Sequence, residues 1–420
     1  MEKLSKEMNF FKNNNANELM EKYGSPLYVY SEDILLERTR EIKQLVDYDN
    51  FVVNYSAKAN TSLGILQIIE KEGLHVDAMS PGEIFVEMEA GFTSDRIFYI
   101  SNNVNEDELI FALEKGVIVS IDSLSQLEMI GNIHKKALVK GFDGGVCVRF
   151  NSGVGAGHHE KVVTGGKKTK FGINSEYLED VKTIAKEYDL KIIGINQHIG
   201  SLFMDGESYI QGAKNMIDLA KEFPLIKFVD LGGGFGIPYN RKHGEKALDL
   251  KELGEILSKY INDFTKELGR EIIFKVEPGR YIACECGVIL GKVTSIKENS
   301  GVKYVGCDIG FNVLQRPVMY DSYHEIEIDS QDGELEKVTV VGNICESGDV
   351  LGKDRILPKA SVGDVVTVYD AGAYGYTMAS NYNQRLRPAE VLIRSNGEVV
   401  LLRKRDSFES LIENQFKINV

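Results

Sequence analysis

The chain has 420 residues, of which 43% are hydrophobic, and it carries a formal net charge of −14. Such a length exceeds what one hydrophobic core usually fills, so we expect two domains, although an α/β barrel can form one large domain. The acidic balance argues against binding to nucleic acid or to anionic membrane surfaces, because both require a basic footprint.

Neither export nor membrane insertion is expected. The N-terminal stretch MEKLSKEMNFFKNNN has no cleavage-site pattern, and the chain contains no run of about 18 apolar residues. The five cysteines are odd in number and sparse, which favours a reducing cytoplasm over a disulfide framework. Cys284 and Cys286 have no second Cys/His pair nearby, so we expect no metal site.

A strand-then-helix rhythm repeats from about residue 30 to residue 280. The helical segments show apolar residues at helical spacing, for example Leu63, Leu66 and Ile69. Strands are expected at 51–56, 75–79, 97–100, 117–121, 145–150, 192–198, 226–231 and 272–277. Eight βα units over about 250 residues predict an α/β fold of the (β/α)8 TIM-barrel type rather than an open doubly wound sheet.

Lys58 is a lone lysine at the end of the first barrel strand, after the uncharged run FVVNYSA. Active sites of α/β folds form at the carboxyl ends of their strands. A desolvated lysine there has a lowered pKa and can form a Schiff base with a carbonyl cofactor such as pyridoxal phosphate. The alternative is an ordinary lysine whose ammonium reaches solvent from a strand end.

Two motifs follow the sixth and seventh strands. His198-Ile199-Gly200-Ser201 offers an imidazole that can stack on a ring and a hydroxyl that can bind phosphate. The glycine-rich run 232–236 permits close approach of backbone amides to a phosphate, and its late position suits a barrel rather than a dinucleotide-binding sheet. A core histidine and a tight turn are the alternatives.

Glu277-Pro278-Gly279-Arg280 closes the eighth strand. A buried carboxylate that faces a pyridine nitrogen keeps that nitrogen protonated. The guanidinium can pair with a carboxylate in a bidentate manner. A structural Glu-Arg ion pair at a domain junction is the alternative.

Beyond residue 280 the pattern changes to short β-rich runs between Gly, Asp and Asn turns, for example 287–296, 337–341, 365–369 and 390–393. These runs predict a C-terminal all-β domain, and we expect the strand-like run 27–30 to join it. The expected division is 31–280 for the barrel and 1–30 plus 281–420 for a β-sandwich or β-barrel domain. In the latter, Cys345-Glu346-Ser347-Gly348-Asp349 places a protonatable thiol beside two carboxylates, where it either delivers a proton or is a buried cysteine in an acidic turn.

Together these motifs form an ordered set along nearly the whole chain. Its members are 23–29, YSAKAN around Lys58, Val76-Asp77, Thr164-Gly165, Lys170-Phe171-Gly172, HIGS, GGGFG, EPGR, Arg316-Pro317, Tyr320, His324, CESGD, 370–375 and Asn381-Tyr382-Asn383. With this set the sequence resembles the pyridoxal-phosphate-dependent decarboxylases of the alanine-racemase-like barrel fold (fold type III), most closely the diaminopimelate decarboxylases.

The resemblance implies a cofactor site and two catalytic residues. Lys58 holds pyridoxal 5′-phosphate, His198 stacks on the ring, and Cys345 is the proton donor. The implied cofactor-binding residues are Lys58, Asp77, His198, Ser201, Gly234, Glu277, Gly279, Arg280 and Tyr374.

The resemblance also implies a substrate that carries both a carboxylate and an ammonium at its far end. The implied activity is decarboxylation of meso-2,6-diaminopimelate to L-lysine and carbon dioxide, the last step of lysine biosynthesis. The residues implied to contact the substrate are Arg280, Arg316, Tyr320, Glu346 and Tyr374. Members of this group are typically homodimers, in which the CESGD loop of one subunit reaches the site of the other.

Two alternatives stay open. A related substrate such as carboxynorspermidine also bears a carboxylate. A relative that acts by protein interaction would lack cofactor chemistry, but Lys58, Glu277 and Cys345 are all present.

Overall fold

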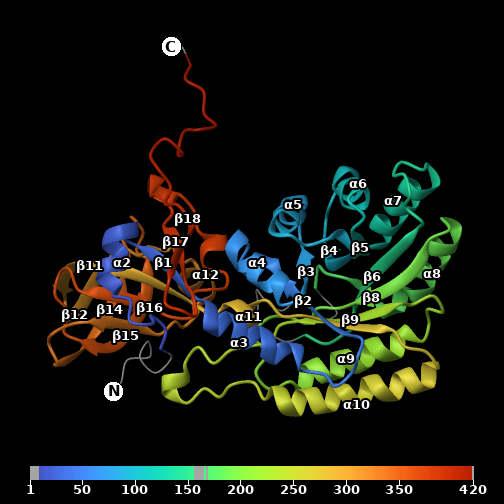
Figure 1. Ribbon diagram of the computed structural model, residues 1–420, viewed down its shortest axis with the longest axis horizontal. Helices are drawn as coiled ribbons and strands as arrows, with labels where there is room; N and C mark the ends of the chain where they lie inside the picture. Colours follow the sequence, from blue (N-terminus) through green and yellow to red (C-terminus); the bar gives the residue numbers. More distant parts are fainter. Residues whose placement is uncertain (1–8, 156–164, 167–168, 419–420) are drawn as a thin grey trace. The chain divides into compact units, whose positions relative to one another are not determined.

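The structure, a computed structural model, describes residues 9–155, 165–166 and 169–418 (Figure 1). Thr164, part of the motif set above, lies outside these residues. The chain forms two compact units: the β-unit comprises Met1–Glu37, Tyr239–Glu245 and Ala283–Val420, and the barrel unit comprises Arg38–Pro238 and Lys246–Ile282. The unit boundaries fall within helices α3 (Glu32–Lys43) and α11 (Arg280–Ala283) and on either side of the segment Tyr239–Glu245.

The barrel unit contains a closed parallel sheet. Its strand order is β5-β4-β3-β2-β10-β9-β8-β6, and pairing of β5 with β6 completes the ring. The strands are β2 (Phe51–Ser56), β3 (His75–Ala78), β4 (Ile97–Ile100), β5 (Ile118–Ile121), β6 (Gly145–Asn151), β8 (Lys191–Asn196), β9 (Phe228–Gly233) and β10 (Ile273–Glu277). A two-residue strand, β7 (Ile173–Asn174), pairs only with β6 among the described strands.

Helices lie outside this ring and end with defined caps (Figure 1). They are α4 (Leu63–Lys71), α5 (Pro81–Ala90), α6 (Glu106–Glu114), α7 (Leu124–Lys135), α8 (Leu178–Glu187), α9 (Glu207–Ala220) and α10 (Leu250–Leu268). For example, Asn105 and Glu108 form a reciprocal capping box at the start of α6, and Gly269 ends α10 in the left-handed conformation.

Alternation along the last barrel strand determines which side chains face the interior. Phe274 packs edge-to-face against Phe264 of α10, at a ring distance of 6.1 Å, so it points outward. Side chains of a strand alternate between its two faces, and Lys275 and Glu277 therefore point into the barrel. Both are buried.

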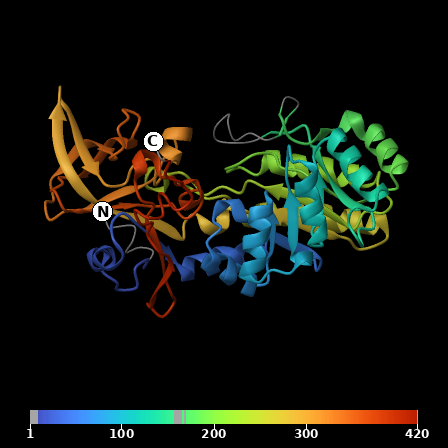
Figure 2. The same cartoon turned by 90° about the horizontal axis from the view of Figure 1, so that it is seen from above.

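The β-unit is built on a sheet of order β15-β14-β12-β11-β1-β17-β18, with β16 joining β11 to β13. Figure 2 shows its long antiparallel ladder of β11 and β12 in gold and orange. The strands are β1 (Leu27–Ser31), β11 (Gly287–Asn299), β12 (Val302–Cys307), β13 (Ile326–Asp329), β14 (Leu335–Val341), β15 (Val350–Pro358), β16 (Val365–Val368), β17 (Ala389–Ile393) and β18 (Val399–Arg403). The unit also holds α2 (Ala16–Tyr23) and α12 (Arg316–Tyr320).

The fold class expected from the sequence is confirmed. The eight barrel strands are present, and β1 joins the β-unit between β11 and β17. Several strand ends differ by one or two residues from the expected ones; β8, for example, ends at Asn196, and His198 therefore lies in the loop beyond the strand rather than at its end. Among the described residues no helix combines the length and the apolar character that a membrane crossing requires.

Candidate active site

Lys58 lies on a single 3-10 turn, Ala57–Ala59, that follows β2 directly. The side chain is half-buried, while Ala57 and Ala59 on either side are buried. Its positive charge opposes the rise in pKa of Asp77, Glu83 and Glu277. The turn therefore presents an amine to a group of carboxyls at the carboxyl end of the barrel.

Asp77 lies on the neighbouring strand β3 and is fully buried. Burial raises the pKa of Asp77 to about 7, while the Lys58 charge and a hydrogen bond from Ser56 act in the opposite direction. Oδ2 accepts that bond from Ser56 Oγ at 2.6 Å, and Oδ1 accepts none from the described residues. The carboxyl is thus close to its midpoint of ionisation at neutral pH and is influenced by the lysine.

The side chains of Glu277 and His198 lie close together, with Glu277 Oε2 3.9 Å from His198 Nδ1. Burial raises the pKa of Glu277 well above its ordinary value, and the nearby Asp230 and Asp77 add to the effect. Burial and the charges of Lys58 and Arg149 lower the pKa of His198 well below its ordinary value. Both shifts favour the neutral form of the group and so disfavour an ion pair between the two side chains.

The tautomer of His198 follows from its hydrogen bond. The backbone N–H of Gly233 donates to His198 Nδ1 at 3.2 Å, so Nδ1 is the acceptor and the ring proton lies on Nε2. Glu277 Oε1 is buried and has no hydrogen-bond partner among the described residues. A buried carboxyl oxygen without a partner is costly, which indicates that a ligand polar group belongs there.

The loops after β8, β9 and β10 pack backbone to backbone. Gly234 has φ 107°, and a Cβ added there would meet the Gly200 carbonyl oxygen at 2.3 Å. A Cβ on Gly279 would meet Ser56 Cβ at 2.8 Å. Only glycine fits these two positions, which leaves backbone amides open to close approach by a ligand.

A guanidinium completes this cluster of loops. Arg280 is buried and donates from Nη2 to Ser201 Oγ at 2.9 Å. The Phe203 N–H donates to the Gly234 carbonyl at 3.0 Å and ties the loop after β8 to the loop after β9. The structure thus brings Ser201, Gly234, Gly279 and Arg280 together into one anion-binding cradle beside Lys58.

The residues of the barrel unit fit a phosphorylated pyridine aldehyde. Lys58 supplies the amine, Glu277 an unpartnered carboxyl oxygen for a ring nitrogen, and the glycine loops with Arg280 a phosphate cradle. Within the described ranges, no group of three or more His, Cys, Asp or Glu side chains is arranged to hold a metal ion.

Arg316, the first residue of α12, is held in a fixed orientation within the β-unit and is 1% exposed. Its Nη1 lies 2.9 Å from His324 Nε2, and its Nη2 donates to Ser322 Oγ at 3.1 Å. His324 Nδ1 lies 2.8 Å from the Tyr369 carbonyl, which can only accept, so Nδ1 carries the proton and Nε2 accepts from the guanidinium. These hydrogen bonds orient the guanidinium within the β-unit.

The turn 345–349 exposes its thiol. Cys345 is exposed, whereas Cys147, Cys284, Cys286 and Cys307 are buried. Asp349 anchors the turn by accepting the backbone N–H groups of Phe311 and Ile344, each at 2.7 Å. A Cβ on Gly348 would meet Val318 Cγ1 at 3.9 Å, so α12 contacts the same turn.

The two remaining candidates also belong to the β-unit. Tyr320 is half-buried and ends α12, while Tyr374 is half-buried with φ 56°. Left-handed backbone is rare for a tyrosine and often marks functional segments. The alternative of a buried cysteine at position 345 does not hold, since that side chain is exposed.

Three buried charged residues of the barrel interior were not predicted. Arg149 of β6 lies with Cζ 4.7 Å from the Phe171 ring centroid, and Glu277 and Asp77 oppose the lowering of its pKa by burial. Lys275 Nζ lies over the rings of Phe98 and Phe228, at 5.2 and 4.8 Å. Asp230 accepts from Asn54 Nδ2 at 3.2 Å. The sequence signal that could have found such residues is a single charged residue inside an otherwise apolar strand, as in VCVRF at 146–150.

Comparison with known proteins identifies the family. Residues 32–284 match the model of the pyridoxal-dependent decarboxylases, pyridoxal binding domain. A diaminopimelate decarboxylase of Methanothermobacter thermautotrophicus is 42% identical over 411 residues, which cover 95% of this chain and 94% of the relative.

Solved structures agree in fold and in length. The diaminopimelate decarboxylase of M. jannaschii in complex with L-lysine matches at a TM-score of 0.86 and 34% identity, covering 96% of this chain and 95% of that one. That of Helicobacter pylori, also complexed with L-lysine, matches at 0.87 and 28% identity, covering 95% and 98%. The chain belongs to the diaminopimelate decarboxylase family of pyridoxal-dependent decarboxylases.

Proposed function

We propose that this enzyme decarboxylates meso-2,6-diaminopimelate to L-lysine and carbon dioxide with pyridoxal 5′-phosphate as cofactor. The names of relatives that cover almost the whole chain support the substrate, as do the two related structures that hold L-lysine. The observation that carries the proposal is the buried Glu277 carboxyl, whose raised pKa and unpartnered oxygen suit a pyridine nitrogen.

Residues of the barrel unit hold the cofactor. Lys58 Nζ would bind its aldehyde group, and the amides around Gly234 and Gly279, with Ser201 Oγ and Arg280, would bind its phosphate. The imidazole of His198 would lie against the ring, and Tyr374 would add a contact to the phosphate. When bound, the cofactor provides an electron sink for the pair that remains when a carboxylate leaves Cα.

Two buried acids, Glu277 and Asp77, would influence the protonation of the cofactor ring and of Lys58. Burial favours the protonated form of Glu277, which would hydrogen-bond the pyridine nitrogen of the bound cofactor and support its electron-withdrawing power. Asp77, with a pKa of about 7, would stabilise the ammonium form of Lys58.

Specificity comes from charges that match the far end of the substrate. Arg316 and Arg280, with Tyr320 and Tyr374, bind the distal carboxylate, and Glu346 binds the distal ammonium. A bidentate guanidinium–carboxylate contact is strong in a buried site, and an analogue without the carboxylate leaves a buried charge unpaired. The hydrogen bonds of Arg316 with His324 and Ser322 support this role, because they hold the guanidinium in one orientation.

Cys345 donates the final proton. The bond between Cα and the carboxylate breaks, carbon dioxide leaves, and the Sγ proton is transferred to Cα, so that L-lysine results. The exposure of Cys345 in a single chain supports a site assembled with a second copy. We propose a homodimer in which Cys345 and Glu346 complete the site of the other subunit.

The location and the domain division are also proposed. Five free cysteines support the cytoplasm. For the functional domains we retain residues 31–280 as the cofactor-binding barrel and 1–30 plus 281–420 as the part that completes the active site.

Carbon dioxide release from meso-diaminopimelate, carboxynorspermidine, ornithine and arginine tests the proposed substrate. We expect turnover of diaminopimelate at least about 100-fold more efficient than that of ornithine or arginine, because neither has the distal carboxylate. A higher catalytic efficiency with carboxynorspermidine would show that this compound, and not diaminopimelate, is the preferred substrate. If the protein stays colourless after addition of pyridoxal phosphate, it does not bind the cofactor, and the proposed enzymatic activity is contradicted.

A further inference from the structure

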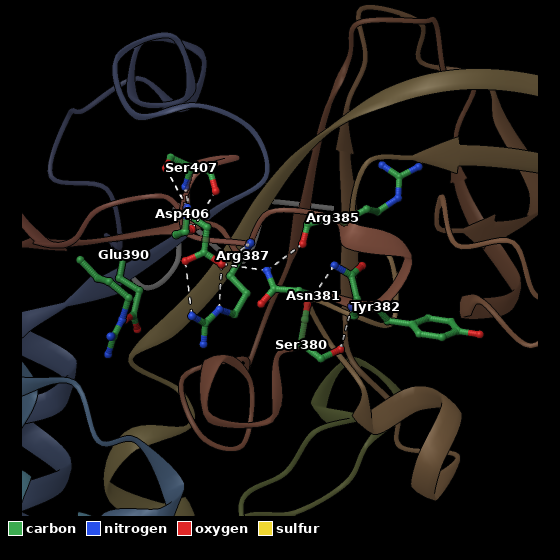
Figure 3. Close-up of polar contacts among 11 residues, drawn as sticks. Ser380, Asn381, Tyr382, Arg385, Arg387, Glu390, Asp406 and Ser407 are labelled. Atoms are coloured by element: carbon green, nitrogen blue, oxygen red, sulfur yellow. Dashed lines mark hydrogen bonds and ion pairs between the residues drawn. The ribbon is translucent and has the colours of Figure 1, made fainter. Parts of the chain in front are cut away.

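A turn next to Cys345 is held more firmly than an ordinary surface loop. We call the residues 381–387 the supporting turn (Figure 3). Asn381 Nδ2 donates to the Arg385 carbonyl at 2.9 Å and to Asp406 Oδ2 at 2.8 Å. Arg387 donates to the same Oδ2 from its backbone N at 3.1 Å and from Nε at 2.9 Å. Asp406 thus ties both ends of the turn together.

Two successive residues of this turn have left-handed backbone. Asn383 has φ 56° and Gln384 has φ 54°. Asparagine tolerates this region, but a glutamine there is uncommon, and such residues persist only where the surroundings enforce them. The four hydrogen bonds around Asn381 and Asp406 supply that constraint. The turn therefore holds the side chains of Tyr382 and Asn383 in defined directions.

Both side chains contact the turn that carries the thiol. Asn383 Oδ1 accepts the backbone N–H of Cys345 at 3.1 Å, and the Tyr382 hydroxyl donates to Glu346 Oε1. Arg385 Nη2 adds a bond to the Asn343 carbonyl at 2.8 Å. Asp349 holds the same segment from its other end, as described above. The backbone of Cys345 and the carboxylate of Glu346 are therefore each held by one residue of the supporting turn.

We propose that Asn383 and Tyr382 are positioning residues for the decarboxylation: Asn383 fixes the backbone from which Cys345 delivers its proton, and Tyr382 fixes the carboxylate of Glu346. This inference rests on the proposed roles of Cys345 and Glu346. Tyr382 is 44% exposed and Asn383 is also exposed, so neither side chain contributes a large buried surface to the core. The Asn383 amide and the Tyr382 hydroxyl are directed at the turn that carries the two functional groups, while the Tyr382 ring stacks on Phe311 at a ring distance of 5.6 Å.

The variant Asn383→Gly removes the hydrogen-bond acceptor without straining the backbone, so it tests the hydrogen bond alone. Glycine accepts a φ of 56° without strain but removes Oδ1, whereas Asn383→Asp retains an acceptor and also tolerates this region. For the glycine variant we expect kcat to fall about tenfold, the equivalent of one lost hydrogen bond, while KM for diaminopimelate changes less than about twofold. Asn383→Asp restores most of kcat.

Hydrogen exchange of the cofactor-loaded enzyme without substrate gives a readout that does not depend on activity. In the peptide that contains Cys345, amide exchange becomes faster in Asn383→Gly and stays near wild type in Asn383→Asp, because the amide loses its acceptor only in the former. Asn13→Gly is the matched control, since Asn13 is also exposed and has φ 68°. It leaves both kcat and the exchange of this peptide unchanged.

Tyr382→Phe probes the second contact. Loss of the hydroxyl frees Glu346, so KM for diaminopimelate rises about threefold to tenfold while kcat changes less than about twofold. Unaltered exchange at Cys345 in Asn383→Gly, or an identical kinetic effect of the Asn383→Gly and Tyr382→Phe variants, would overturn the inference. If wild type does not turn over diaminopimelate, the proposed function fails, whereas the exchange result still decides whether Asn383 holds the Cys345 backbone.

Discussion

At the scale of single residues, the chemistry near Lys58 depends on which of its neighbours carry charge. Burial raises the pKa of Glu277 and lowers the pKa of His198, and so favours the neutral form of each group. The sequence indicated these residues by their positions after strands. It could not indicate their protonation, which depends on burial and on the charges of residues distant in sequence, such as Arg149 near His198 and Asp230 near Glu277.

Replacing Lys58 with alanine abolishes turnover and leaves the fold intact. The amine is the group that binds the cofactor covalently, while its side chain is only half-buried on a short turn. Carbon dioxide release is lost, borohydride no longer fixes the cofactor to the chain, and the melting temperature stays within a few degrees of wild type. Lys71→Ala, an exposed lysine at the end of α4, serves as the control. Persistent turnover in Lys58→Ala would contradict the assignment.

Replacing Arg316 with alanine weakens binding of the substrate far more than binding of the cofactor. The loss of a bidentate contact reduces kcat/KM for diaminopimelate about 100-fold, or about 3 kcal/mol, because a charge-assisted pair is removed from a buried site. Arg316→Lys recovers only part of the loss, since an ammonium lacks the planar fork. Cofactor affinity, measured by titration of the visible absorbance, stays unchanged. Diaminopimelate kinetics equal to wild type would refute the specificity argument.

At the scale of elements, the strands were predictable because their patterns are local. The predicted strand 51–56 coincides with β2, and 226–231 differs from β9 by only two residues at each end. By contrast, the hydrogen bonds of Arg316 with His324 and of Cys345 with Asn383 depend on tertiary packing of separate segments. No periodicity in the sequence encodes those contacts.

Helix α5 contains an acid that destabilises the fold as the pH rises. Glu87 is fully buried, and neither carboxyl oxygen has a hydrogen-bond partner among the described residues. Burial, together with the charge of Glu83 one turn earlier, raises the pKa of Glu87 to about 10. Above the ordinary pKa of a glutamate the folded chain keeps a proton that the unfolded chain loses, so folding becomes less favourable from about pH 4.5 toward pH 10.

Glu87→Gln removes this proton linkage. Relative to wild type, its free energy of unfolding increases with pH, by at most about 3 kcal/mol between pH 4.5 and pH 7, because each pH unit contributes about 1.4 kcal/mol. Urea unfolding at both pH values measures the difference. Glu89→Gln on the exposed side of α5 shows no such trend. A Glu87→Gln difference independent of pH would show that the carboxyl is ionised in the folded protein.

At the scale of the whole molecule, the β-unit combines distant parts of the chain. Strand β1 pairs antiparallel with β11 and parallel with β17, so residues near position 30 complete a sheet formed mainly by residues beyond 283. The strand-like run 27–30 made this pairing predictable. The short segment Tyr239–Glu245 also belongs to the β-unit, and no sequence pattern indicated it.

Mixing two inactive variants tests the proposed shared sites. In a heterodimer of Lys58→Ala and Cys345→Ala subunits, one of the two sites receives both intact residues. Random exchange of subunits places half of the chains in heterodimers, so about a quarter of wild-type activity returns. Size-exclusion chromatography confirms the dimer, and mixing each variant with itself is the control. No recovery despite subunit exchange would show that Cys345 acts within its own chain.

The most direct test of the central claim is the product of the cofactor-loaded enzyme with meso-diaminopimelate. We predict equal amounts of carbon dioxide and L-lysine, with a kcat/KM at least about 100-fold above that for ornithine or arginine. No carbon dioxide from diaminopimelate, at full cofactor occupancy shown by the visible absorbance, would contradict the account.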